Sequence, residues 1–162
     1  MAGHADAGGR VAELEAEPLV WYRTECAALN DRRMNALIRH GLAPDRIQAL
    51  GLVTALLLEL AQTEGHAVWY DPANPASVAG IADVLGFTGD SAAENASRLL
   101  ALLERWHIIH KCTDPDGQPA IGAACIDQSA HNRATHARAA ELSHDSRRRR
   151  PTKERNGSNV EQ

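Results

Sequence analysis

The sequence predicts a mainly α-helical fold with a small β component, arranged as a winged helix-turn-helix. Three observations support this prediction. A long leucine-rich helical segment comes first, two shorter helical segments separated by a glycine turn at Gly86 follow, and a β-hairpin around 114–117 comes directly after them. Helix, tight turn, longer helix and hairpin is the order of a winged helix, whose second helix enters the major groove of DNA.

The chain of 162 residues fits one domain with two tails. Residues 1–17 and 144–162 lack the apolar residues that would order them, so we predict that both are disordered and that residues 18–143 form the winged-helix domain. The sequence contains no apolar run that could cross a membrane and no signal-peptide pattern. We therefore expect a cytoplasmic protein without membrane association.

The first predicted elements are a short β-prone run at 19–22 and a helix that Asn30 caps and Gly41 ends. Pro44 and Asp45 are then predicted to open the long helix within its first turn. Its apolar stripe is broad, which predicts the most buried element of the fold. The stripe comprises Ile47, Leu50, Leu52, Val53, Leu56, Leu57, Leu58, Leu60 and Ala61.

Gly65 is predicted to end the long helix, and a short strand is expected at 67–70. The next helix is predicted to begin at Ser77 as its N-cap and to end at Gly86 in the left-handed conformation.

The second helix of the pair is predicted to begin with a capping box of Ser91 and Glu94 and to run to about His107. The hairpin should follow it at once, with Gly117 at the turn position that needs a positive φ. The remaining expected elements are strands at 108–112 and 120–126 and a last helix from Asp127 or Ser129 to about Leu142.

Candidate DNA contacts follow one face of this second helix at three- and four-residue steps. The predicted face comprises Ser91, Asn95, Arg98, Leu102 and Arg105. Asparagine can pair with adenine and arginine with guanine, and the N-terminal half of a recognition helix normally reaches the base edges. Asn95 and Arg98 are therefore the candidate base readers. The alternative is an ordinary solvated face, which carries the same residue types.

Other basic residues are candidates for phosphate contact. Lys111 is the only base of the hairpin, whose tip carries two aspartates, so we expect a weak phosphate contact there. For Arg32, Arg33 and Arg39 a solvated helix face is the favoured interpretation. The densest positive charge is a C-terminal run that could hold DNA non-specifically or act as a solubilising end. This run comprises Arg147, Arg148, Arg149 and Arg150.

The net charge of −4 hides a gradient along the chain. Residues 1–16 carry one Arg against three acids, residues 17–143 carry ten Lys and Arg against fifteen acids, and residues 144–162 carry six against three. An acidic central region weakens DNA affinity, since Lys and Arg supply most of the non-specific binding free energy. The basic C-terminal segment offsets part of this.

No pattern in the sequence predicts an enzyme or a bound cofactor. Glycine-rich phosphate loops, a nucleophile elbow and close carboxylate pairs are absent. His107, His110 and Cys112 have a ligand-like spacing, but they span a helix-to-strand junction that should separate them, so no metal site is expected. The three cysteines, with Cys26 and Cys125 as the others, are widely spaced and are expected to be reduced thiols.

Several passages of the sequence share their pattern with a family of replication proteins. They are Trp21-Tyr22-Arg23, Asn30-Asp31, the leucine-rich helix, Gly65 before a strand, Ile81-Ala82-Asp83-Val84-Leu85-Gly86, and the stretch from Leu99 to Ile109 before a strand. Over residues 19–143 the chain resembles the N-terminal winged-helix domain of phage replisome-organiser proteins, which are similar to DnaD-like primosome proteins. The resemblance implies a role in loading replication machinery at an origin on phage or prophage DNA, with replication proteins as partners. Transcriptional control is the other cellular role that we expect for such a DNA-binding protein. In that family such a domain can serve oligomerisation instead.

The alternative function is a protein-interaction or oligomerisation module of the same fold without DNA contact. Leu102 and the Ala-rich last helix, with Ala130, Ala134 and Ala137, would then form a helix-pairing surface, in a homodimer for example. This alternative explains the acidic central region better. The dependence of binding on salt concentration distinguishes the two functions. DNA binding weakens steeply as the salt concentration rises, whereas binding through an apolar interface hardly changes.

Overall fold

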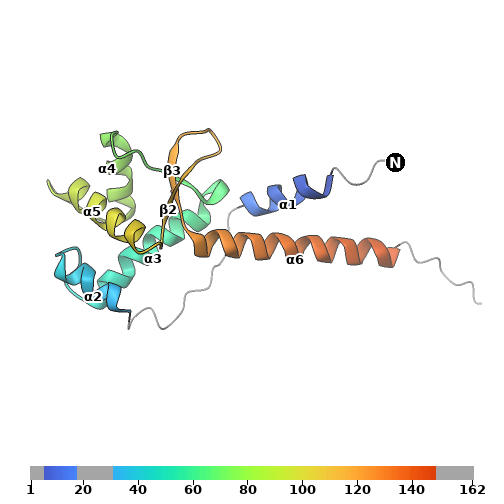
Figure 1. Ribbon diagram of the computed structural model, residues 1–162, viewed down its shortest axis with the longest axis horizontal. Coiled ribbons are helices and arrows are strands. Elements are labelled where there is room, and N and C mark those ends of the chain that lie inside the picture. The colour runs from blue at the N-terminus through green and yellow to red at the C-terminus, as the bar shows by residue number, and fades with distance from the viewer. Residues whose placement is uncertain (1–5, 18–30, 149–162) are drawn as a thin grey trace, which may run out of the picture.

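The computed structural model describes residues 6–17 and 31–148, and within them it is mainly helical with a small three-stranded antiparallel sheet (Figure 1). The elements are α1 (Asp6–Ala16), α2 (Arg32–Arg39), α3 (Arg46–Gln62), the 3-10 turn η2 (Glu64–His66), β1 (Val68–Trp69), α4 (Pro75–Val84), α5 (Ala92–Arg105), β2 (His110–Thr113), β3 (Pro119–Gly122) and α6 (Ala124–Arg148). The mainly helical fold class with a small β component is thereby confirmed. The run at 19–22 lies outside the described residues.

The helix N-caps differ from the predicted ones by one to three positions. Asp31, not Asn30, caps α2 by accepting a hydrogen bond from the Arg33 N–H at 2.8 Å. Asp45 caps α3 in the same way, so Pro44 precedes the helix and does not form its first turn. In each case the aspartate carboxylate satisfies an N–H group that the first helical turn leaves without a partner.

Helix α4 begins at Pro75 with Asn74 as its N-cap, and the prediction of Ser77 as the cap is wrong. The Ser77 side chain is buried inside the first turn, where its Oγ accepts from the Asp71 N–H at 2.9 Å and donates to the Asp71 carbonyl at 2.7 Å. Ser77 therefore fastens the loop before α4 instead of starting the helix.

The turn between α4 and α5 contains Gly86 at φ +72°, as predicted. The predicted capping box of Ser91 and Glu94 is wrong. Ser91 has φ −92° and ψ 3°, and its side chain makes no capping hydrogen bond, since this backbone is close to helical and not extended as a capping box needs.

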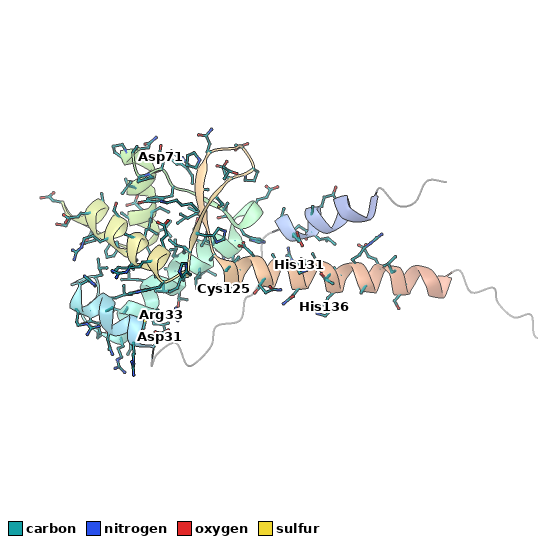
Figure 2. The ribbon with its side chains drawn as sticks, viewed as in Figure 1. Asp31, Arg33, Asp71, Cys125, His131 and His136 are labelled. Atoms are coloured by element: carbon teal, nitrogen blue, oxygen red, sulfur yellow. The ribbon has the colours of Figure 1, made fainter. Side chains whose placement is uncertain are left out.

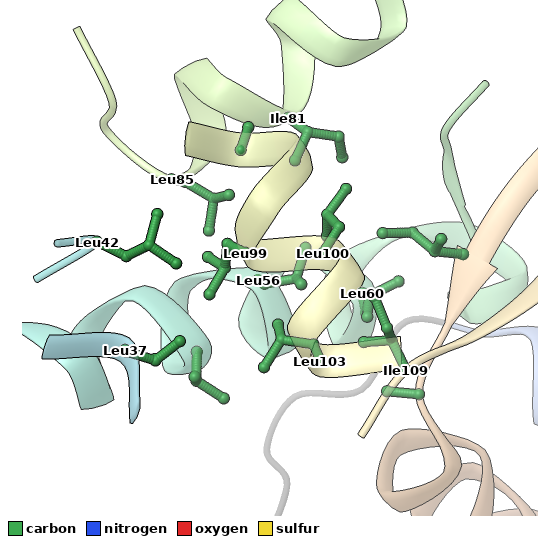
Figure 3. Close-up of a cluster of buried hydrophobic side chains, with 14 of the residues drawn as sticks. Leu37, Leu42, Leu56, Leu60, Ile81, Leu85, Leu99, Leu100, Leu103 and Ile109 are labelled. Atoms are coloured by element: carbon green, nitrogen blue, oxygen red, sulfur yellow. The ribbon is translucent and has the colours of Figure 1, made fainter. Parts of the chain in front are cut away.

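Helix α3 is hydrophobic on nearly all sides, yet only one line of it is fully covered. Its buried residues Ala49, Val53, Leu56 and Leu60 follow helical spacing. The predicted broad stripe is wrong at two positions, because Ile47 is 77% exposed and Leu58 is 45% exposed. Figure 3 shows Leu56 and Leu60 of this line facing leucines from α5, with Ile81 of α4 and its C-cap Leu85 nearby.

The sheet has the order β1-β3-β2, with both neighbouring pairs antiparallel. Its hairpin turns where Gly117 has φ +78°, and the Asp114 carboxylate accepts from the Gln118 N–H at 2.7 Å. Strand β3 ends at Gly122, earlier than the predicted 126, because α6 begins at Ala124. The short β1 joins the hairpin to the segment before α4.

Helix α1 and the last turn of α6 lie in the segments 1–17 and 144–162 that we predicted to be disordered, so that prediction is wrong for residues 6–16 and 144–148. Helix α1 lies along α6 (Figure 1), Leu14 is buried between them, and Arg133 Nη2 donates to the Leu14 and Glu17 carbonyls. Helix α6 begins before the predicted caps Asp127 and Ser129 and continues to Arg148, beyond the predicted end at Leu142. No helix among the described residues is long and apolar enough to cross a membrane.

The register of α3 can be tested with two leucines two residues apart. Leu56→Ala should lower the free energy of unfolding by about 2–5 kcal/mol, because Leu56 is fully buried. Leu58→Ala should lower it by at most about 1 kcal/mol, because Leu58 is largely exposed. Urea unfolding followed by circular dichroism measures both, and equal losses would contradict this register.

Candidate nucleic-acid interface

Helix α5 is fixed in the fold by its inner face. Ala96, Leu99, Leu100 and Leu103 are all buried at helical spacing, and the close-up in Figure 3 shows the leucines between α3 and α4. A helix held by one buried stripe presents its opposite side to solvent. The outward residues of α5 are therefore set by the packing of its leucines.

The outward face of α5 consists of residues at three- and four-residue steps that are all exposed. They are Ser91, Glu94, Arg98, Ala101 and Arg105. Asn95 and Leu102, which we predicted to belong to this face, are half-buried at its edge. Glu94 lies on this face although we did not predict it there, and the same spacing that selected Arg98 from the sequence could have selected it.

Arg98 connects α5 to the end of α2. Its Nη2 donates to the His40 carbonyl at 2.6 Å, and its Nη1 lies 3.5 Å from Asn95 Oδ1. His40 is the C-cap of α2, where helix carbonyls lack partners within the helix. A guanidinium has five N–H groups, so the exposed Arg98 keeps donors for a ligand while it holds the two helices together.

The charged residues along α5 would have opposite effects on an approaching phosphate. Arg105 is exposed in the last turn and has no carboxylate partner within the described part of the chain. Glu94 lies in the first turn, where a negative charge stabilises the helix through the helix dipole. The same carboxylate would repel a phosphate that approaches the N-terminal half of the face.

The hairpin contributes little free positive charge. Lys111 Nζ lies 3.2 Å from Glu104 Oε1 on α5, and Asp114 and Asp116 are at the turn. The lysine therefore has its charge balanced by a carboxylate within the molecule. This arrangement supports the expectation that the hairpin makes a weak phosphate contact.

Only part of the C-terminal basic run falls within the described residues. Arg147 and Arg148 are the last two residues of α6, which extends away from α5 (Figure 1), whereas Arg149 and Arg150 lie outside the described residues.

The histidines and cysteine at the end of α5 do not form a metal centre. His107 is exposed with φ +56°, and His110 Nε2 lies 3.5 Å from Asp127 Oδ2. No group of three or more metal-ligating side chains exists among the described residues. Burial, together with the negative charges of Asp127 and Asp114, raises the pKa of the Cys112 thiol.

The raised pKa predicts slow reaction of Cys112 with thiol reagents. The thiolate is the reactive form, so the alkylation rate should rise with a midpoint at higher pH than for free cysteine. Iodoacetamide labelling of a Cys26→Ser/Cys125→Ser variant from pH 7 upwards isolates this group. A midpoint below that of free cysteine would contradict the burial of Cys112 in this environment.

No family model, curated protein or solved structure matches the chain. The properties of the candidate interface therefore rest on its own residues. The likeness to replisome-organiser proteins stays a prediction.

Proposed function

We propose that the chain is a winged helix-turn-helix protein that binds double-stranded DNA with α5 in the major groove. The observation that carries the proposal is the outward face of α5, where Arg98 and Arg105 stand on a helix that its leucines hold rigidly. The order of elements supports it, because α4, the Gly86 turn, α5 and the β2–β3 hairpin follow one another as in a winged helix. Strand β1 ties the hairpin to the start of α4.

Each residue of the face has a role in this proposal. Arg98, in the N-terminal half of α5, is placed to reach a guanine edge, and Asn95 at the margin would reach adenine. Arg105 in the last turn would contact a phosphate, as would the Ser91 hydroxyl at the first turn. Lys111 contributes less because Glu104 balances its charge.

The acidic residues limit the affinity that this face can provide. Glu94 stands among the arginines, and residues 17–143 carry ten Lys and Arg against fifteen acids. Under this proposal the run from Arg147 to Arg150 adds affinity without sequence preference. We propose a modestly specific DNA-binding protein that works in replication initiation or transcriptional control on phage or prophage DNA, as the resemblance implies. This function needs no enzymatic activity and no cofactor.

The second candidate function is a protein-interaction module without DNA contact. It is favoured by Ile47, which is 77% exposed on α3, and by a separate groove that Leu42, Leu52 and Phe87 line. The surface first suggested for pairing is less available, because Ala130 and Ala134 are buried where α1 lies on α6. Replication proteins or a second copy of the chain are its candidate partners.

The experiment that tests DNA binding compares the full chain with a chain ending at Ser143 on a labelled duplex. Fluorescence anisotropy from about 50 to about 200 mM salt gives the slope of log K against log salt, about 0.9 per phosphate neutralised. A steep slope for both chains supports α5 as the contact. Binding by the full chain alone assigns it to the basic run, and binding by neither chain overturns the proposal.

Arg105→Gln tests the contact on α5 itself. The variant should weaken binding to all sequences alike and reduce the salt slope by about 1, as expected for the loss of one phosphate contact. Arg138→Gln is the matched control, since it removes the same charge on α6, where Arg138 pairs with Glu141. Equal effects of the two substitutions would show that only net charge matters and would contradict a specific role of α5.

Glu94→Gln should change binding and stability in opposite directions. Removing the carboxylate should strengthen DNA binding by about 0.2–1 kcal/mol, the range for exposed charge pairs. It should also lower the free energy of unfolding by about 0.3–1 kcal/mol, because the α5 N-terminus loses a favourable charge. Glu64→Gln on η2 is the control. If that variant also binds DNA more tightly, the effect comes from net charge and not from the position of Glu94 on α5.

A further inference from the structure

Helix α2 presents arginines on the side that faces away from the core. Met34 and Leu37 are its buried residues, and Arg32 and Arg39 are exposed. The two arginines are seven positions apart in the helix, which places them on the same face two turns apart. Asn35 lies on this face between them, because it is three residues after Arg32 and four before Arg39.

A third arginine joins this face from α3. Arg46 Nε donates to Asn35 Oδ1 at 2.8 Å, which brings its guanidinium to the middle of the α2 face. We call Arg32, Arg39 and Arg46 the α2 arginine surface. None of the three has a carboxylate partner within the described residues.

Nearby carboxylates are already engaged with other groups. Arg33 forms an ion pair with Asp31 at the start of α2 (Figure 2), and this hydrogen bonding holds the pKa of Asp31 below its usual value. The Asp45 carboxylate accepts from the Gln48 N–H at 2.8 Å as the cap of α3. The α2 arginine surface therefore keeps positive charge that its neighbours do not neutralise.

The α2 arginine surface is connected to the outward face of α5. Arg98 of α5 bonds the carbonyl of His40, the residue directly after Arg39. The hydrogen bond holds the end of α2 beside the N-terminal half of α5, so the residue that follows Arg39 is in direct contact with Arg98. The hairpin offers no comparable group, since Lys111 is paired and two aspartates flank its turn.

We propose that Arg32 and Arg39 of α2 contact the DNA backbone beside the groove that α5 enters. These contacts would supply the phosphate binding that the hairpin does not supply. This inference rests on the proposed DNA binding. Phosphate contacts fix position without reading sequence, so α2 would supply affinity and register, and α5 would supply any sequence preference.

The test is a salt series with the full chain and its Arg32→Gln/Arg39→Gln variant on two duplexes of unrelated sequence. The salt slope should fall by about 1.8, about 0.9 for each arginine, and binding should weaken equally on both duplexes. Arg39→Lys should keep the slope of the unchanged protein, because it keeps the charge. Both arginines are exposed, and circular dichroism verifies that each variant is folded.

The outcomes separate this inference from the proposal on which it rests. If the double variant binds with an unchanged slope while Arg105→Gln reduces it, α2 is not a contact and DNA binding by α5 stands. If the double variant loses no more per charge removed than Arg138→Gln, the loss reflects net charge and the inference is overturned. If the unchanged chain binds neither duplex at any salt concentration, the proposed function itself fails.

Discussion

The packing of three leucines of α5 against α3 and α4 is the interaction on which the rest of the structure depends. Leu99, Leu100 and Leu103 are almost completely buried, and burial of a leucine is worth roughly 1.5–3 kcal/mol. This contact fixes the rotation of α5 about its axis. It therefore decides that Glu94 and Arg98 face outward and that Asn95 lies half-buried at the margin of the face.

Turns of this fold could be predicted from the sequence where the backbone conformation needs glycine. Gly86 and Gly117 both adopt positive φ, which other residues rarely do, and both turns were expected. Helix starts were harder. The N-caps of these helices are Asp31, Asp45 and Asn74, and each has a second possible cap or a proline within three positions. The sequence alone does not show which of these residues begins the helix, because that depends on tertiary packing. In α3 the leucines occur on nearly all sides of the helix, so the sequence alone did not show which of them are buried.

The candidate site was partly visible in the sequence. Helical spacing selected Arg98 and Arg105, and it also contained Glu94. The bond from Arg98 to the His40 carbonyl could not be foreseen, because it joins residues 58 positions apart and its acceptor is a backbone atom that every residue type carries. Helix α1 was missed for a related reason, since it packs on α6 and is held by Arg133, more than 100 residues away.

The position of α1 on α6 has a consequence for any shortened form of this protein. Leu14 of the first helix is buried, Arg133 Nη2 of α6 donates to its carbonyl, and the Nδ1 atom of His131 lies 2.6 Å from Glu15 Oε1 (Figure 2). A fragment that starts at α2 would expose the face of α6 that carries Arg133 and His131. If such a fragment self-associated, the cause would be the newly exposed face of α6 and not a property of the intact chain.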